Sequence, residues 1–175
     1  MQLLINIILI VLLVIVVVQD LKQREISWIL IPLLLACFWT KGFLQISSGD
    51  LLHSTLLNVS FIALQLLILT IYISIKNKKF INVINSSLGL GDVLFFVVVC
   101  VAFSAINFIL FYVMSLLFTL VGFIAYNTLV KKPVKEIPLA GAMAMVMLSL
   151  IVLNQWMPQF NFYNDDYITG LLFNK

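Results

Sequence analysis

Six apolar runs, separated by short polar segments, organise this sequence. A membrane-spanning helix needs about 20 consecutive, mostly apolar residues. The runs therefore predict six transmembrane helices, at residues 3–18, 26–43, 51–75, 92–104, 108–130 and 137–157. We expect an all-α, polytopic membrane bundle formed by residues 1–157. Residues 158–175 are expected to form an extracytoplasmic tail that is solvated or lies at the membrane interface.

The boundary between the fourth and fifth spans has to be inferred from length. Residues 93–130 contain no charged side chain that would separate two helices. A single helix over that stretch would be about 57 Å long at ~1.5 Å per residue, nearly twice the thickness of the hydrocarbon core. We therefore predict a turn at residues 104–107, which leaves the fourth span short.

Composition supports a membrane protein and argues against a nucleic-acid-binding one. The chain is 63% hydrophobic and 10% charged, with a mean hydropathy of +1.19. A soluble domain of 175 residues cannot bury that much apolar surface, so membrane lipid must be part of its surroundings. The net charge of +3 is not arranged as a basic stripe interleaved with aromatic residues, as nucleic-acid binding would require. The first run lacks a basic segment before it and a small-residue cleavage site after it, so we expect a retained span.

The positions of the basic residues predict how the chain is oriented. Eight of the ten lie in the first, third and fifth loops, and only Lys41 and Lys175 lie elsewhere. Because cytoplasmic loops are enriched in Lys and Arg, these odd-numbered loops are expected to be cytoplasmic. Both chain ends then face outward from the cytoplasmic (inner) membrane. A five-span arrangement would place residues 131–135 on the wrong side, which favours six spans.

Two aspartates lie at the ends of apolar runs. Asp20 follows residues 3–18, and Asp92 immediately precedes residues 93–102. A carboxylate within or next to a membrane helix is costly unless it is paired or functional. Although the two are 72 positions apart, the predicted topology places both at the cytoplasmic side of the membrane, at the same depth. We therefore expect helix packing to bring them together.

Two carboxylates that share a site can carry out acid–base chemistry. They cannot easily both ionise, so near neutral pH the pair can hold a single proton. The ionised member can then take a proton from water while the protonated member polarises a peptide carbonyl group. This is the chemistry of an aspartic protease, and it needs no metal and no cofactor.

Glycines surround the second aspartate in the sequence Gly89-Leu90-Gly91-Asp92. Gly89 and Gly91 can adopt backbone conformations that other residues avoid, and they allow another chain to approach closely, so we assign them to an active-site loop. Structural alternatives exist for both aspartates. Asp92 can be an ordinary cap of a helix N-terminus, and Asp20 can be a helix-end charge among lipid headgroups.

Three stretches together resemble the type IV prepilin peptidases, a G-x-G-D family of membrane aspartyl proteases. The stretch Asp20-Leu21-Lys22-Gln23-Arg24-Glu25-Ile26 resembles the first aspartate motif, and Leu88-Gly89-Leu90-Gly91-Asp92-Val93 resembles the second. The stretch Ile137-Pro138-Leu139-Ala140-Gly141-Ala142 resembles the Ile-Pro motif that opens the last span. The resemblance covers roughly residues 3–157, and the six-span core of that family agrees with the count made from charge.

The chain departs from the pattern of this family at three positions. Ser27 and Trp28 follow Ile26, where the family usually has Pro-Asn, and Leu94 stands where a Lys usually follows the second motif. The change at Leu94 removes a cation beside the second aspartate, and it leaves open a different substrate preference, a shifted pKa of the aspartate pair, or an inactive relative. The cysteine-bearing domain linked to methylation is absent from this sequence, so the resemblance is to the peptidase-only form.

The resemblance implies a substrate and a catalytic pair. The substrate would be a pilin-like precursor, whose short basic leader is removed at the cytoplasmic face, with Asp20 and Asp92 as catalytic residues. Two rival functions stay open. One is a lipoprotein signal peptidase, which should have four spans and extracytoplasmic aspartates. The other is a non-catalytic membrane relative that acts in assembly or transport.

The remaining polar and reactive residues have simpler interpretations. Glu25 and Glu136 are candidates for attracting a basic leader, with ordinary solvated charges as the alternative. His53, the only histidine, is expected on the extracytoplasmic side, away from both aspartates. Cys37 and Cys100 lie inside apolar runs and are expected to be buried small hydrophobic residues. Lipid is expected around the bundle, and the sequence does not fix an oligomeric state.

Overall fold

The computed structural model describes residues 1–79, 88–129, 137–156, 161–166 and 169–170. Within these residues the secondary structure is helical, and each of the six predicted runs contains a helix. The helices are α1 (Gln2–Gln23), α2 (Leu30–Phe43), α3 (Ser48–Asn77), α5 (Leu90–Ala102), α6 (Ala105–Leu129) and α7 (Leu139–Trp156). The predicted all-helical fold is therefore confirmed for the described part of the chain.

The helix boundaries differ from the predicted ones where polar residues continue a helix. α1 runs on through Asp20 to Gln23, so this aspartate lies in its last turn and does not follow the helix. The break between α5 and α6 lies at Phe103 and Ser104, slightly before the predicted turn at residues 104–107. Polar side chains can continue the backbone hydrogen bonding of a helix, so apolar runs underestimate its length.

Length and composition identify four helices that can cross a bilayer, namely α1, α3, α6 and α7. The other two, α2 and α5, have 14 and 13 residues. Both are shorter than the roughly 20 residues that span the hydrocarbon core. The helices thus indicate a membrane-embedded protein, in which α2 and α5 differ in length from the other four.

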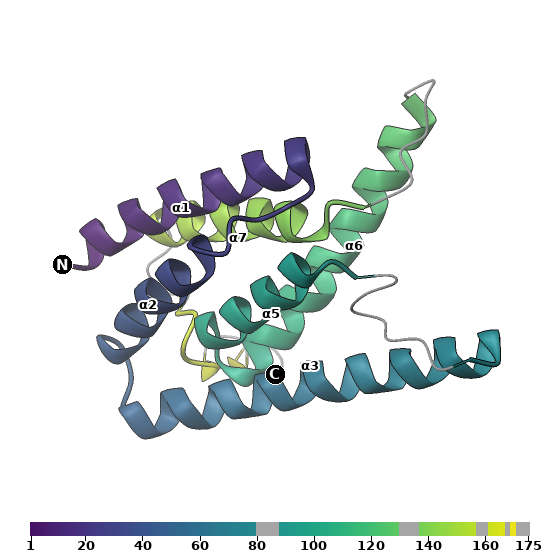
Figure 1. The fold of residues 1–175 in the computed structure, drawn as a ribbon. Coiled ribbons are helices and arrows are strands. Elements are labelled where there is room, and N and C mark those ends of the chain that lie inside the picture. Colours follow the sequence, from purple (N-terminus) through teal and green to yellow (C-terminus); the bar gives the residue numbers. More distant parts are fainter. Residues whose placement is uncertain (80–87, 130–136, 157–160, 167–168, 171–175) are drawn as a thin grey trace.

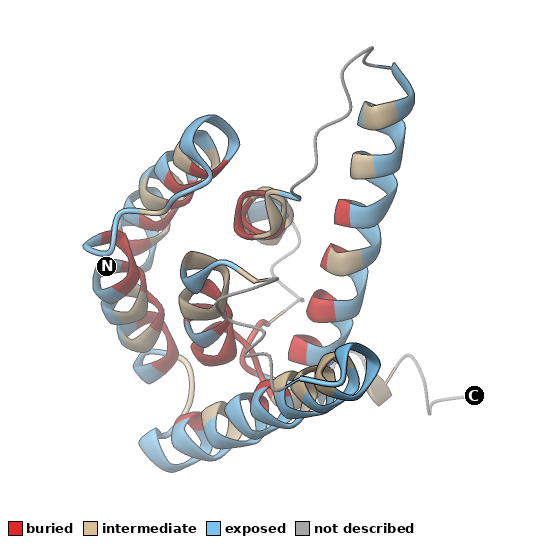
Figure 2. Cartoon of the chain, turned by 45° about the vertical axis from the view of Figure 1, so that its right-hand side comes forward, coloured by how far each residue is buried: buried red, intermediate tan, exposed pale blue. Residues whose placement is uncertain are grey.

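α5 occupies the centre of the bundle and packs against α2, α3, α6 and α7 (Figure 1). More than half of its residues are buried; they are Phe95, Phe96, Val98, Val99, Cys100, Val101 and Ala102. α1 packs mainly along α7, and α2 lies beside α1 and α5. Buried residues lie on the helix faces that are turned toward one another, and exposed residues lie on the outer faces (Figure 2). Many of the exposed residues are large and hydrophobic. Such an exterior suits a surrounding of lipid.

Polar side chains inside the bundle satisfy the free backbone groups at the end of α5. The last carbonyl groups of a helix have no partner within the helix. Asn58 of α3 donates hydrogen bonds from Nδ2 to the carbonyl oxygens of Cys100, at 3.0 Å, and Phe103, at 2.9 Å.

Cys100 is buried as predicted, whereas Cys37 is half-buried, and both are free thiols.

The segment 161–166 is folded into the bundle at the junction of α5 and α6. Phe162 and Tyr163 are 1% and 4% exposed, and the Tyr163 hydroxyl donates to the carbonyl oxygen of Phe38 at 2.8 Å. The prediction of a solvated or interfacial tail is therefore wrong for these two residues. Aromatic side chains can fill space between helices, and here they cover the end of the bundle.

Candidate active site

α1 carries Asp20 into the interior of the bundle. The helix ends at Gln23, and its C-cap residue Arg24 adopts the left-handed conformation (φ 56°) and donates its backbone N–H to the carbonyl oxygen of Asp20 at 3.0 Å. This turn directs the chain toward α2. The Asp20 side chain faces α7 and is only 5% exposed, so it is a buried acid.

α5 begins immediately before the second aspartate. Gly89 is its N-cap, and the backbone N–H of Asp92 donates to the carbonyl oxygen of Gly89 at 3.1 Å. Asp92 therefore lies in the first turn of α5. Gly89 and Gly91 do not use the backbone conformations that other residues avoid, because no described glycine has a positive φ angle. What these two glycines provide is room for close packing.

The space beside each glycine identifies what it packs against. A Cβ atom added at Gly89 would lie 3.3 Å from Oδ2 of Asp92, which is closer than most Cβ contacts. A Cβ atom at Gly91 would lie 3.5 Å from Cδ1 of Ile26, which is an ordinary van der Waals distance. Gly89 is therefore fitted to the carboxylate, and Gly91 to the segment that joins α1 and α2.

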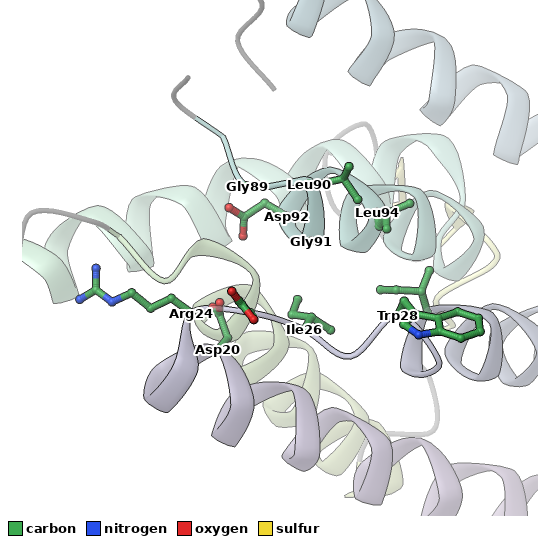
Figure 3. Close-up of a pocket in the computed structure, with 11 residues that line it drawn as sticks. Asp20, Arg24, Ile26, Trp28, Gly89, Leu90, Gly91, Asp92 and Leu94 are labelled. Carbon is green, nitrogen blue, oxygen red and sulfur yellow. The ribbon is translucent and has the colours of Figure 1, made fainter. Parts of the chain in front are cut away.

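Asp20 and Asp92 both line one pocket of about 360 Å³. The structure thus brings together the two aspartates that the sequence predicts at one site. Their carboxylates lie at the same end of the pocket (Figure 3). They come from different helices, at the C-terminus of α1 and the N-terminus of α5, and topology alone predicted that these two ends meet.

The first turn of α7 holds both carboxylates through adjacent backbone amides. The N–H of Ala140 donates to Oδ1 of Asp92 at 2.9 Å, and the N–H of Gly141 donates to Oδ2 of Asp20 at 2.5 Å. The first N–H groups of a helix have no acceptor within the helix, so a carboxylate is a natural partner for them. One helix end therefore fixes two acids that lie on two other helices.

The rest of the pocket wall is mostly apolar. Besides the aspartates and glycines, the lining residues are Arg24, Glu25, Ile26, Trp28, Ile31, Leu90 and Leu94. Trp28 and Leu94 lie at the end of the pocket away from the two carboxylates, with Ile26 between (Figure 3). Leu94 thus forms part of the pocket wall as an apolar side chain.

The other predicted site residues differ in their position relative to the pocket. Glu25 lines the pocket and is exposed to solvent, whereas Glu136 lies outside the described residues. His53 is exposed on α3 and is not a lining residue of this pocket. Within the described ranges, no group of three or more His, Cys, Asp or Glu side chains is placed to hold a metal ion.

Sequence reasoning missed the contribution of backbone atoms to this site. Ala140 and Gly141 act through their N–H groups, which every residue except proline carries, so side-chain chemistry does not mark them. The available signal was positional, because Pro138 immediately precedes the helix and proline favours a helix start. Trp28 was also missed as a pocket residue, although it is a large aromatic side chain close to the first aspartate.

No protein-family model matches this chain, and no curated protein or solved structure matches it either.

Proposed function

We propose that this protein is an intramembrane aspartic endopeptidase that removes the N-terminal leader of pilin-like precursors. The observation that carries the proposal is the presence of Asp20 and Asp92 in one pocket, each held by a backbone amide of α7. A purely structural cap needs one carboxylate at a helix end. Two carboxylates that line one pocket and accept from adjacent backbone amides suit acid–base catalysis better.

The proposed reaction is hydrolysis of one peptide bond by water. An ionised carboxylate of the pair accepts a proton from water, whose oxygen attacks the carbonyl carbon of the substrate. The protonated partner donates a hydrogen bond, and then its proton, to the carbonyl oxygen, which gives a tetrahedral diol. Breakdown of the diol transfers a proton to the leaving nitrogen and releases a carboxyl group and an amine. The two aspartates exchange proton-donating and proton-accepting roles during one turnover.

The composition of the pocket supports a substrate that carries both charge and apolar surface. Glu25 is an exposed acid at the pocket and can attract basic residues of a leader. Trp28, Ile31 and Leu94 offer an apolar wall for the hydrophobic residues that follow a leader. The identity of the substrate class rests on the resemblance of the three sequence stretches to the prepilin peptidases.

We place the site at the cytoplasmic face, in a chain that crosses the membrane six times. The basic loops support this orientation by the positive-inside rule. The short helix α5 is compatible with six crossings because other helices surround it, so few of its side chains need to meet lipid. Water can then reach the N-terminus of α5 through the pocket.

Leader removal from a co-expressed pilin-like precursor tests the proposal. The native chain is expected to convert the precursor to its mature form, and Asp20→Asn and Asp92→Asn are expected to leave it uncut. Asp50→Asn is the matched control, since Asp50 is an exposed acid in the first turn of α3, outside the pocket. Protein amounts in the membrane fraction must be equal for all four chains.

Two results would contradict the proposal. Normal leader removal by either aspartate variant would show that Asp20 and Asp92 are not a catalytic pair. Failure of the native chain on a panel of pilin-like precursors would favour a non-catalytic role in assembly or transport. Cleavage of a lipid-modified precursor, with both aspartates on the extracytoplasmic side, would identify the lipoprotein signal peptidase alternative.

A further inference from the structure

We infer that Gly141 is a positioning residue of the site, which fixes the Asp20 carboxylate through its N–H and through the absence of a side chain. The role in catalysis rests on the proposed function, whereas the role in placing the carboxylate does not. Gly141 stands in the third of the stretches that resemble the family, but no functional role was predicted for it from the sequence. Its case is built from the packing of α1 against α7.

The two helices meet along small and apolar side chains. α1 and α7 pack against each other, and the almost completely buried residues of the two helices include Leu13 and Val16 of α1 and Ala140, Ala144 and Met147 of α7. Small residues allow helix backbones to approach closely in a membrane. Asp20 is the next buried residue of α1 after Val16, so the same close approach brings a charged group against the start of α7.

At this point the structure leaves no room for a side chain. A Cβ atom built on Gly141 would lie 2.7 Å from Oδ2 of Asp20 and 3.0 Å from Cβ of the same residue. The first distance is shorter than real Cβ contacts, so the carboxylate would have to move. The Cβ of Asp20 is fixed on a packed helix, and the side chain has only two rotatable bonds with which to respond.

Movement of the carboxylate would also break the hydrogen bond that orients it. The Gly141 N–H donates to the same oxygen, Oδ2, that an added Cβ atom would displace. The steric contact of an added Cβ atom and the hydrogen bond from the Gly141 N–H therefore both involve Oδ2 of Asp20. The adjacent Ala140 N–H would still hold Asp92, so displacement of Asp20 would change the geometry between the two acids.

Other glycines of the chain provide matched controls. Gly122 lies in α6 and has nothing within 4 Å of an added Cβ atom. Gly42 is crowded, with Cδ1 of Leu51 2.7 Å from an added Cβ atom, but the atoms around it belong to Leu51 and Tyr163 and to neither aspartate. Gly122→Ala thus controls for the change of residue type, and Gly42→Ala controls for crowding away from the site.

The first measurement is chemical modification of carboxyl groups in the purified, full-length protein, which needs no activity. A water-soluble carbodiimide and an amine label accessible carboxyl groups, and mass spectrometry quantifies the label at each position. We expect Gly141→Ala to increase labelling of Asp20 several-fold over the native chain, with labelling of Asp50 unchanged. Gly42→Ala and Gly122→Ala should leave Asp20 as in the native chain. Unchanged labelling of Asp20 in a folded Gly141→Ala protein would overturn the inference.

The second measurement, the melting temperature, tests the inference even if Gly141→Ala folds poorly. Alanine is a better helix former than glycine, so Gly122→Ala should raise the melting temperature. Gly141→Ala should lower it because of the contact with the carboxylate. In an Asp20→Ala background the Oδ2 atom is gone, and the loss caused by Gly141→Ala should shrink. An equal loss in both backgrounds would contradict the inference.

Kinetics then separate this inference from the proposed function. For a cleaved precursor, Gly141→Ala should lower kcat about 10- to 100-fold with KM nearly unchanged, because a misplaced catalytic group affects the transition state and not substrate binding. Increased labelling of Asp20 without cleavage by the native chain would keep the positioning role and reject the peptidase. Cleavage by the native chain with normal kcat in Gly141→Ala would reject the positioning role and keep the peptidase.

Discussion

Gly141 donates its backbone N–H to Oδ2 of Asp20 across 121 positions of sequence. This contact joins the last turn of α1 to the first turn of α7. Together with the hydrogen bond from Ala140 to Asp92, it makes the start of α7 a common support for both acids. The importance of a glycine at this site therefore depends on which atoms surround it, and less on the motif in which it stands.

The two glycines of the Gly-Leu-Gly-Asp stretch should differ in their tolerance of alanine. Gly91→Ala is expected to fold and to keep most of its activity, because its added Cβ atom meets Ile26 at an ordinary distance of 3.5 Å. Gly89→Ala is expected to lose more activity, since its Cβ atom crowds Oδ2 of Asp92 at 3.3 Å. Leader-removal rates of the two variants, at equal protein level, check this order. The reverse order would show that the packing distances do not govern these positions.

Leu94 should contribute to substrate binding and not to the chemical step. It forms part of the apolar pocket wall, away from the carboxylates (Figure 3). Leu94→Ala removes part of that wall, and we expect KM to rise about fivefold, which corresponds to roughly 1 kcal/mol of lost apolar contact. The value of kcat should change little. A large fall in kcat at constant KM would place Leu94 in the catalytic step.

The folded part of the C-terminal segment should stabilise the bundle through Asp165. Its Oδ1 accepts hydrogen bonds from the hydroxyl of Ser104 at 2.6 Å and from the backbone N–H of Asn107 at 3.1 Å, at the start of α6. Asp165→Ala should lower the free energy of unfolding by about 1–2 kcal/mol, as for loss of a helix N-cap. Thermal unfolding in detergent measures the effect. Asp166→Ala is the control, since Asp166 is exposed and bonds only within its own segment in the described structure, and an equal loss there would contradict the prediction.

The orientation of the chain predicts opposite labelling of the two ends of α3. In a background of Cys37→Ser and Cys100→Ala, a cysteine is introduced by Ser47→Cys or by Lys78→Cys. A membrane-impermeant maleimide added to intact cells should label Ser47→Cys and should label Lys78→Cys only after the membrane is opened, because the basic third loop is expected inside. Labelling of Lys78→Cys in intact cells would invert the topology and place the pocket outside.

The pattern of apolar and charged residues predicted much of the helical architecture. The apolar runs predicted the number and approximate positions of the helices, because membrane helices need long stretches without charge. Charge in the loops then placed Asp20 and Asp92 at the same end of the bundle, and the structure brings them into one pocket. Helix lengths were less accurate, since polar residues at a helix end, such as Asp20, continue the helix.

Contacts between segments that are distant in the sequence could not be predicted from the pattern of apolar and charged residues. The amides of Ala140 and Gly141 bear no side-chain signal, and their role depends on how α7 packs against α1 and α5. The burial of Phe162 and Tyr163 likewise depends on space left between other helices. The sequence also suggested unusual backbone angles at Gly89 and Gly91, whereas the structure uses their small size.

The central claim, that Asp20 and Asp92 act as one catalytic unit, is tested most directly by the kinetics of single and double variants. Purified native chain, Asp20→Asn, Asp92→Asn and the double variant are compared on one cleaved precursor. We predict that each single change lowers kcat by about 100- to 10,000-fold, and that the double variant is no worse than the poorer single one, because the two groups work in the same step. A single variant that retains a rate near that of the native chain would contradict the claim.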